Sequence, residues 1–175
     1  MKNILVTGGM GFIGSHTTIQ LINNGYNPII IDNLCNSKIE VLNRIEIISK
    51  VRPTFYQYDV RDEKHLDEIF SKHNIFAVIH FAGLKSVGES VEKPELYFDN
   101  NIGSTDVLLK VMKKHNVKNI VFSSSATVYG DPKRVPIVET DPVGKVTNPY
   151  AETKVQIENI LKNLAVQDSS LNIAI

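Results

Sequence analysis

Tyr150 and Lys154 stand four residues apart, and Tyr150 directly follows Pro149. Proline suits the first turn of a helix, so this spacing predicts a helix that carries both side chains on one face. A free phenol has a pKa near ~10 and is a poor base at neutral pH, but a neighbouring ammonium favours its ionised form. Such a tyrosine could take a proton from a hydroxyl group while hydride leaves the same carbon.

A run of serines ends the strand that is predicted before this helix. Ser125 is the last residue of "KNIVFSSS" and could hydrogen bond to the oxygen that loses its proton. The Tyr-x-x-x-Lys spacing is frequent in surface helices, so a pair without chemistry is the alternative for these two residues taken alone. Together with a glycine-rich turn and an acidic residue after the second strand, the pattern favours Tyr150 as a general base.

The glycine-rich turn near the N-terminus is typical of dinucleotide binding. Gly8, Gly11 and Gly14 recur every three residues between a predicted strand and a predicted helix. Glycine lets the backbone approach a pyrophosphate, which the free N–H groups at the helix start would bind. Asp32 follows the second strand, where a carboxylate binds both ribose hydroxyls and favours NAD over NADP, although it could instead cap a turn. Asp59, after the third strand, could accept from the adenine amino group or serve only in a turn.

Predicted strands and helices alternate along the whole chain. Strands are predicted at residues 2–8, 27–33, 54–59, 76–83, 118–125 and 171–175. Helices are predicted at residues 12–24, 37–50, 62–72, 94–115 and 150–165, with Asn36 or Ser37 capping the second and Asp62 the third. Because the strands are mostly apolar throughout, we expect helices on both faces of the sheet. The pattern predicts an α/β doubly wound parallel sheet, a Rossmann-like domain, and the alternative is such a domain without a nucleotide site.

Composition makes several classes of function unfavourable. The 19 basic and 19 acidic residues give a formal net charge of zero, so no nucleic-acid partner is expected. No apolar run reaches the roughly 18 residues of a membrane span, so no membrane partner is expected. The single cysteine, Cys35, fits a reducing cytoplasm. No histidine and cysteine spacing indicates a metal site, and His80 is expected to be a core residue within an apolar strand.

Six stretches carry a family resemblance: VTGGMGFIGSH, DNLCNS, VIHFAGLKSVGES, DNNIGST, FSSSATVYGD and NPYAETK. Together they resemble the UDP-glucose (UDP-galactose) 4-epimerase family of the extended short-chain dehydrogenase/reductase superfamily, over residues 2–175. The resemblance implies a bound NAD, transient oxidation at sugar C4, and interconversion of UDP-galactose and UDP-glucose in galactose metabolism. It also implies a homodimer for the full-length parent. Ser125, Tyr150 and Lys154 are the implied catalytic residues, and Ser125 and Tyr150 would contact the substrate.

The resemblance also implies a set of NAD contacts. These fall on Gly8, Gly11, Phe12, Ile13, Gly14, Asp32, Asn33, Leu34, Cys35, Asn36, Ser37, Asp59, Val60, Phe81, Ala82, Gly83, Leu84, Lys85 and Asn100. Lys85 would place a cation near the pyrophosphate.

The sequence departs from related families and from the usual pattern at a few positions. Nucleotide-sugar 4,6-dehydratases resemble S-T-D-E-V-Y-G at the end of strand five, whereas this chain has Ala126 and Thr127 at the acid and base positions. Elimination is therefore disfavoured. Phe12 and Ala151 replace a usual tyrosine and glycine, and Met10 could crowd the glycine turn.

Family members continue for about as many residues again. The resemblance therefore predicts that residues 1–175 are an incomplete NAD-binding domain, truncated in the sixth strand and without the C-terminal substrate domain. Two alternatives remain beside the epimerase. One is a catalytically incomplete NAD-binding fragment, and the other is a different extended short-chain dehydrogenase/reductase that acts on nucleotide sugars.

Overall fold

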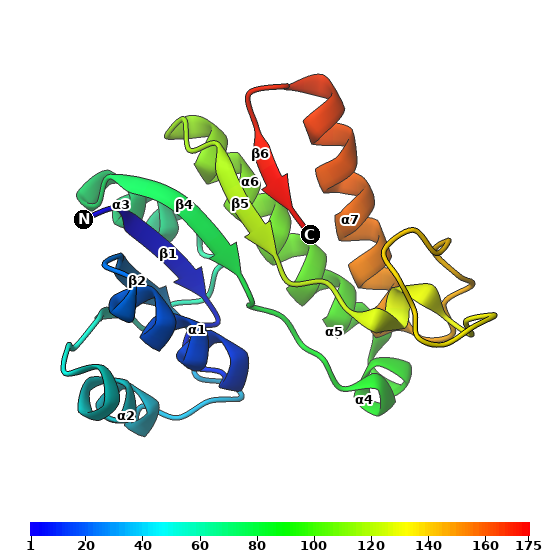
Figure 1. The fold of residues 1–175 in the computed structure, drawn as a ribbon, viewed down its shortest axis with the longest axis horizontal. Coiled ribbons are helices and arrows are strands. Elements are labelled where there is room, and N and C mark those ends of the chain that lie inside the picture. The colour runs from blue at the N-terminus through cyan, green and yellow to red at the C-terminus, as the bar shows by residue number, and fades with distance from the viewer.

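The computed structural model describes residues 1–175 and contains one six-stranded sheet in which all strands are parallel (Figure 1). The strands are β1 Asn3–Thr7, β2 Asn27–Ile31, β3 Thr54–Tyr56, β4 Ile75–His80, β5 Asn119–Phe122 and β6 Asn172–Ala174. Their order in the sheet is β3-β2-β1-β4-β5-β6. This is the order of doubly wound dinucleotide-binding domains, and it confirms the predicted fold class.

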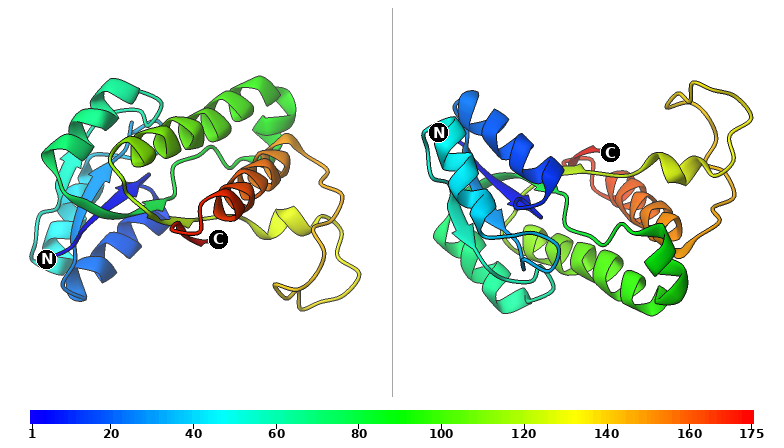
Figure 2. Two further views of the ribbon diagram at one scale, coloured as in Figure 1. Left: turned by 90° about the horizontal axis from the view of Figure 1, so that it is seen from above. Right: turned by 90° about the horizontal axis from the view of Figure 1, so that it is seen from below.

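Helices connect the strands and cover the sheet. They are α1 Phe12–Asn23, α2 Glu40–Ser49, α3 Glu63–Lys72, α4 Val87–Glu92, α5 Pro94–Tyr97, α6 Gly103–Lys114 and α7 Pro149–Gln167, with a π-helical turn η1 Phe98–Ile102 and a 3₁₀ turn η2 Ala126–Tyr129. Figure 2 shows α1 on one side of the sheet and α3 and α6 on the other. None of these helices combines the length and the apolar character that a membrane crossing requires.

The core has two parts, one on each face of the sheet. Ile29 and Ile31 of β2 belong to a cluster of 17 buried residues that also contains side chains of α3, α6 and α7. Ile30 belongs to a smaller cluster with Ile19 of α1 and Ile45 of α2. Burial of an aliphatic side chain of this size contributes about 1.5–3 kcal/mol, so both faces of β2 help to stabilise the fold. The uninterrupted apolar strands follow from this arrangement.

Two helices differ from the sequence-based expectation. The stretch expected as one helix over residues 94–115 is divided by η1, where the backbone makes a π-helical turn between α5 and α6. Helix α2 begins at Glu40 instead of following a cap at Asn36 or Ser37, because the Ser37 hydroxyl donates to Asp32 at 2.9 Å. The expected cap at Asp62 is confirmed, since its side chain accepts from the His65 N–H at the start of α3.

Asparagine side chains join neighbouring strands at the amino-terminal edge of the sheet. Asn27 Nδ2 donates to Asn3 Oδ1 at 2.8 Å, and Asn172 Nδ2 donates to Asn119 Oδ1 at 2.9 Å. Asn119 Nδ2 donates in turn to the Phe76 carbonyl at 2.7 Å. The starts of the outer and central strands are therefore connected by side-chain bonds as well as by the backbone ladder.

Residues 130–148 form a loop without a helix or strand, apart from turns, and Figure 1 shows it extending beyond the sheet near the start of α7. The loop is closed at its base, where the Gly144 N–H donates to the Val128 carbonyl at 3.1 Å. Arg134 and Asp141 form a bidentate pair within it, with nitrogen–oxygen distances of 3.0 and 2.8 Å.

Candidate active site

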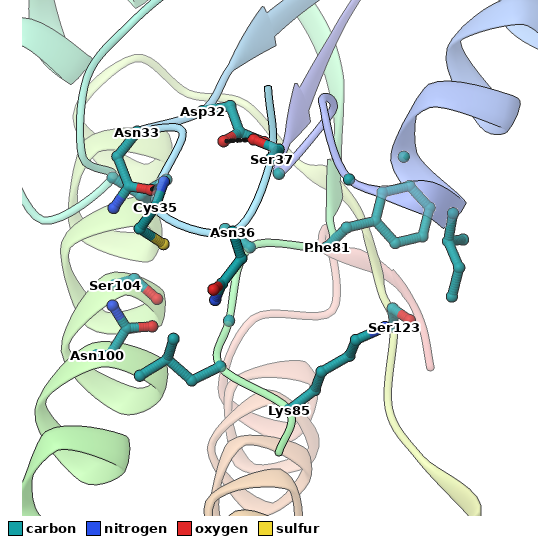
Figure 3. Close-up of a pocket in the computed structure, with 18 of the residues that line it drawn as sticks. Asp32, Asn33, Cys35, Asn36, Ser37, Phe81, Lys85, Asn100, Ser104 and Ser123 are labelled. Carbon is teal, nitrogen blue, oxygen red and sulfur yellow. Dashed lines mark hydrogen bonds between the residues drawn. The ribbon is translucent and has the colours of Figure 1, made fainter. Parts of the chain in front are cut away.

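A cavity lies at the carboxyl-terminal edge of the sheet. Its volume is about 670 Å³, and its walls come from the segments after β1, β2, β3, β4 and β5, together with η1 and the start of α7 (Figure 3). Open α/β sheets bind ligands at this edge, next to the point where the strand order reverses. The volume falls within the range of roughly 300–1,000 Å³ that small-molecule sites have.

The cavity brings together the residues that the sequence indicated, with one exception. It is lined by Gly8, Gly11, Phe12, Ile13, Gly14, Asp32, Asn33, Cys35, Asn36, Ser37, Asp59, Val60, Phe81, Ala82, Gly83, Leu84, Lys85, Asn100, Ser125, Tyr150 and Lys154. The exception is Leu34, which does not line the cavity and packs against the smaller core cluster instead.

The sequence reasoning missed seven residues of the cavity wall. They are Ile31, Ser86, Glu89, Tyr97, Ser104, Ser123 and Ser124. Ser123 and Ser124 belong to the same serine run as Ser125, so the signal for them was present. Glu89 and Tyr97 come from α4 and α5, and the Tyr97 hydroxyl donates to Glu89 at 3.0 Å, a contact that no spacing rule indicates.

The glycine turn leaves no room for side chains. Gly8 has φ +66°, and a Cβ there would lie 2.7 Å from the Ala82 nitrogen. A Cβ at Gly14 would lie 2.3 Å from the Gly8 carbonyl oxygen. Both glycines are therefore required by close backbone approach. The sequence suggested that Met10 could crowd this turn. It does not, because its side chain is buried in the smaller core cluster.

The start of α1 is available to an anion. Its N-cap is Gly11, which has no capping side chain, and no acidic residue occupies the first turn. The first-turn N–H groups of a helix lack partners within the helix and carry a partial positive charge. Phe12 and Ile13 of the same turn are 77% and 56% exposed, so apolar side chains also face the solvent here. This combination suits a ligand that has both phosphate and apolar parts.

The Asp32 carboxylate accepts three hydrogen bonds within its own neighbourhood. The donors are the Met10 N–H at 3.0 Å, the Leu34 N–H at 2.9 Å and the Ser37 hydroxyl at 2.9 Å. The dashed line in Figure 3 marks its bond to Ser37. Asp32 thus shapes the turn after β2 and also lines the cavity, so the two interpretations of this residue are compatible.

Asp59 lines the same cavity near Asn33, and Arg61 holds its carboxylate. Arg61 donates to it through Nε at 3.0 Å and Nη2 at 2.9 Å, and Asn33 Nδ2 donates at 3.0 Å. The Arg61 side chain is the main reason that the pKa of Asp59 is lowered to about 2. The carboxylate is therefore ionised and fixed in direction.

Tyr150 and Lys154 lie on the first two turns of α7, and both are buried. Asn148 caps this helix, since its side chain accepts from the Ala151 N–H at 2.8 Å. Lys154 Nζ donates to the Ser123 carbonyl at 2.8 Å and lies 5.9 Å from the centre of the Tyr150 ring. Burial lowers the pKa of Lys154 to about 8. Tyr150 is 8% exposed and lines the cavity. Its hydroxyl has no hydrogen-bond partner in the protein, so it is free to bond a ligand.

Ser125 caps the 3₁₀ turn η2 at the end of β5. Its Oγ accepts from the Thr127 N–H at 3.2 Å and lies 2.9 Å from Thr127 Oγ1. A serine hydroxyl can accept two hydrogen bonds and still donate one. The Ser125 proton can therefore be offered to a ligand oxygen in the cavity.

Two basic side chains near this edge of the sheet differ in their surroundings: Lys85 lines the cavity, and His80 is buried in the core. Figure 3 shows Lys85 extending from the segment after β4 toward the end of β5, where Ser123 lies. His80 is buried between Thr7 and Thr105, with ring nitrogens 2.6 and 3.1 Å from their hydroxyl oxygens. Burial, and then the charge of Lys154, lower the pKa of His80 to about 3. The expectation of a core histidine is confirmed.

Comparison with known proteins gives consistent results. A family model described as GDP-mannose 4,6 dehydratase matches residues 5–171. A UDP-glucose 4-epimerase of Yersinia pestis is 52% identical over 172 residues, which is 98% of this chain and 51% of that protein. The chain spans about half the length of the curated UDP-glucose 4-epimerases it matches.

Solved structures agree with the sequence matches. A UDP-glucose 4-epimerase from Bifidobacterium longum, crystallised in complex with NAD⁺ and UDP, superposes with a TM-score of 0.97 at 55% identity. The match covers 98% of this chain and 51% of that one. A UDP-glucose 4-epimerase from Brucella ovis, in complex with NAD, gives a TM-score of 0.89 at 39% identity, covering 99% and 50% of the two chains.

Proposed function

The chain belongs to the family described as GDP-mannose 4,6 dehydratase, and we propose that within it the chain is the NAD-binding part of a UDP-glucose 4-epimerase. The observation that carries the proposal is one cavity lined by the glycine turn, Asp32, Ser125, Tyr150 and Lys154. The proposal includes UDP-galactose and UDP-glucose as substrates, a role in galactose metabolism, and a cytoplasmic location. It also includes a homodimer of a longer chain that supplies a substrate domain beside residues 1–175.

The chemistry of the cavity walls fits NAD. The start of α1 would hold the pyrophosphate, with Lys85 as a further cation, and Asp32 would accept from the ribose hydroxyls of the adenosine half. A carboxylate at Asp32 disfavours the additional phosphate of NADP. When bound, NAD supplies the hydride acceptor that oxidation of an alcohol requires.

Tyr150 is proposed as the general base and acid at C4 of the hexose. Its oxygen has no hydrogen-bond partner in the protein, so as a phenolate it can take the proton from the C4 hydroxyl, become the phenol, and return that proton to the oxygen of the opposite epimer. Lys154, with a pKa of about 8, is mostly charged at neutral pH and favours the phenolate during this transfer. Ser125 can donate to the same sugar oxygen, which keeps the C4–O bond oriented.

Ala126 and Thr127 distinguish this proposal from the dehydration named in the family description. A 4,6-dehydration needs an acid and a base beyond the C4 group, and Ala126 can be neither. The Thr127 hydroxyl lies 2.9 Å from Ser125 Oγ and is engaged there. Simple oxidation and re-reduction at C4 is the chemistry that these positions favour.

The test has two stages. NAD binding to the 175-residue chain is measured first by calorimetry, and conversion of UDP-galactose is then measured with NAD supplied, by a coupled assay for UDP-glucose. We expect NAD binding; turnover would support the complete proposal, whereas binding without turnover would limit the chain to cofactor binding. Tyr150→Phe should abolish any turnover and preserve NAD binding, and retained turnover would rule out the role of Tyr150.

A further inference from the structure

One arginine connects two separate segments beside the cavity, the one after β3 and η1. Arg61 follows β3, and its guanidinium forms a fork on Asp59, with Nε 3.0 Å from Oδ1 and Nη2 2.9 Å from Oδ2. The remaining nitrogen, Nη1, donates to Asp99 of η1. Asp59 lines the cavity, and so does Asn100, which follows Asp99 directly.

The bonds of Asp59 leave its carboxylate no rotational freedom. Oδ1 accepts from the Arg61 N–H and Nε, and Oδ2 accepts from Arg61 Nη2 and from Asn33 Nδ2. An ionised carboxylate has about four favourable acceptor positions, so all of them are directed by neighbours. Asn33 also lines the cavity, so Arg61 indirectly fixes the segment after β2.

Arg61 could act in either of two ways that have different consequences. As a charge, it would offset the negative field of Asp32, Asp59 and Asp99 on an anionic ligand. As a brace, it would keep the wall after β3 at a fixed distance from η1, for which the planar five-donor fork is required. Its bonds to two segments favour the brace, because an effect of charge alone would not require directed bonds to carboxylates of both.

We propose that Arg61 is a positioning residue for the adenosine half of the dinucleotide, and that it acts by bracing Asp59 against Asp99. The inference rests on the proposed function only as far as NAD binding. Asp59 lies on the side of the cavity where Asp32 and Asn33 mark the adenosine end. The acceptor positions of Asp59 are filled by protein donors, so it acts by holding Asn33 and the segment after β3 in place. A loose Asp59 would let this wall move, which would weaken contacts with the adenine nucleotide and leave the nicotinamide end unchanged.

Two conservative variants separate the brace from the charge. Arg61→Lys keeps the positive charge but cannot bond both carboxylates as a fork, so we expect the Kd for NAD and for AMP to rise about five- to tenfold. Asp99→Asn removes a negative charge, which would tighten anion binding if charge alone mattered. The brace predicts the opposite sign, with both Kd values rising about threefold.

The measurement is isothermal titration of the chain with NAD and, separately, with AMP. Arg52→Lys is the matched control, because Arg52 pairs with Glu46 at 2.5 Å on the surface and does not line the cavity. Three results would each overturn the inference: an unchanged Kd for NAD in Arg61→Lys, a lower Kd for NAD in Asp99→Asn, or a raised Kd for NAD without a raised Kd for AMP. Absence of NAD binding by the unmodified chain would instead refute the proposed function. Asp99 is 70% exposed in its side chain, so Asp99→Asn remains a test even if Arg61→Lys does not fold.

Discussion

Burial of Lys154 predicts a measurable link between stability and pH. Its pKa falls from 10.5 in the unfolded chain to about 8 in the folded one, because burial disfavours the ammonium. Between these two pH values the unfolded chain binds the additional proton, so stability rises with pH. The difference of about 2.5 units corresponds to about 3 kcal/mol at 1.36 kcal/mol per unit. Below pH 8 the folded protein therefore carries this full penalty, and above pH 10.5 the penalty is relieved.

Lys154→Met isolates the effect. Methionine keeps the length and the apolar stem but loses the bond to the Ser123 carbonyl, whose removal costs about 1.5–3 kcal/mol. At pH 7 this loss and the relieved penalty nearly cancel, so the two proteins should be similar in stability. As pH rises to 10.5, wild type should gain about 3 kcal/mol relative to Lys154→Met.

The assay is urea unfolding followed by circular dichroism at intervals from pH 7 to 10.5, with the difference between the two proteins taken at each pH. Other titrating groups contribute to both proteins and drop out of the difference. Lys113→Met, an exposed lysine on α6, is the matched control and should give a constant difference. If the Lys154→Met difference were also constant with pH, the argument from burial would be refuted.

The backbone of the site provides two further predictions. Gly14→Ala would place a Cβ 2.3 Å from the Gly8 carbonyl oxygen, so it should destabilise the chain by about 2 kcal/mol or more and abolish NAD binding. Thermal unfolding and NAD titration measure these two effects. Gly88→Ala is the control: its Cβ would have nothing within 4 Å, so stability should stay the same or rise. Asn148→Ala should cost about 1 kcal/mol by removing the cap of α7, and Asn148→Ser should restore most of it; equal unfolding midpoints for all three would contradict the cap.

Local sequence patterns predicted much of the fold and many residues of the cavity wall. The alternation of apolar strands and helices predicted the six strands, most clearly at β1 and β2, which are buried on both faces. The glycine spacing predicted a close turn because Gly8 and Gly14 meet backbone atoms. The strand and helix alternation and the glycine spacing are local patterns, so the sequence alone predicts them, although the backbone that Gly8 approaches lies at Ala82, far along the chain.

What the sequence did not predict depends on distant partners. Ser37 does not cap α2, because its hydroxyl bonds Asp32, and sequence rules treat it only as a possible cap. Asn101 in η1 bonds both backbone groups of Leu84, at 2.8 and 3.0 Å, which accompanies the π-helical turn that interrupts a continuous helical pattern. The roles of the individual cavity residues remain proposals, since they concern a ligand.

The asparagine bonds at the amino-terminal edge of the sheet have a practical use. That edge is the one farthest along the strands from the cavity, and Met1 beside it is 95% exposed. A surface coupled through Met1 would therefore leave the nucleotide cavity accessible to solution. Such an orientation would suit an immobilised sensor for nicotinamide nucleotides, with the interlocked strand starts serving as a rigid base.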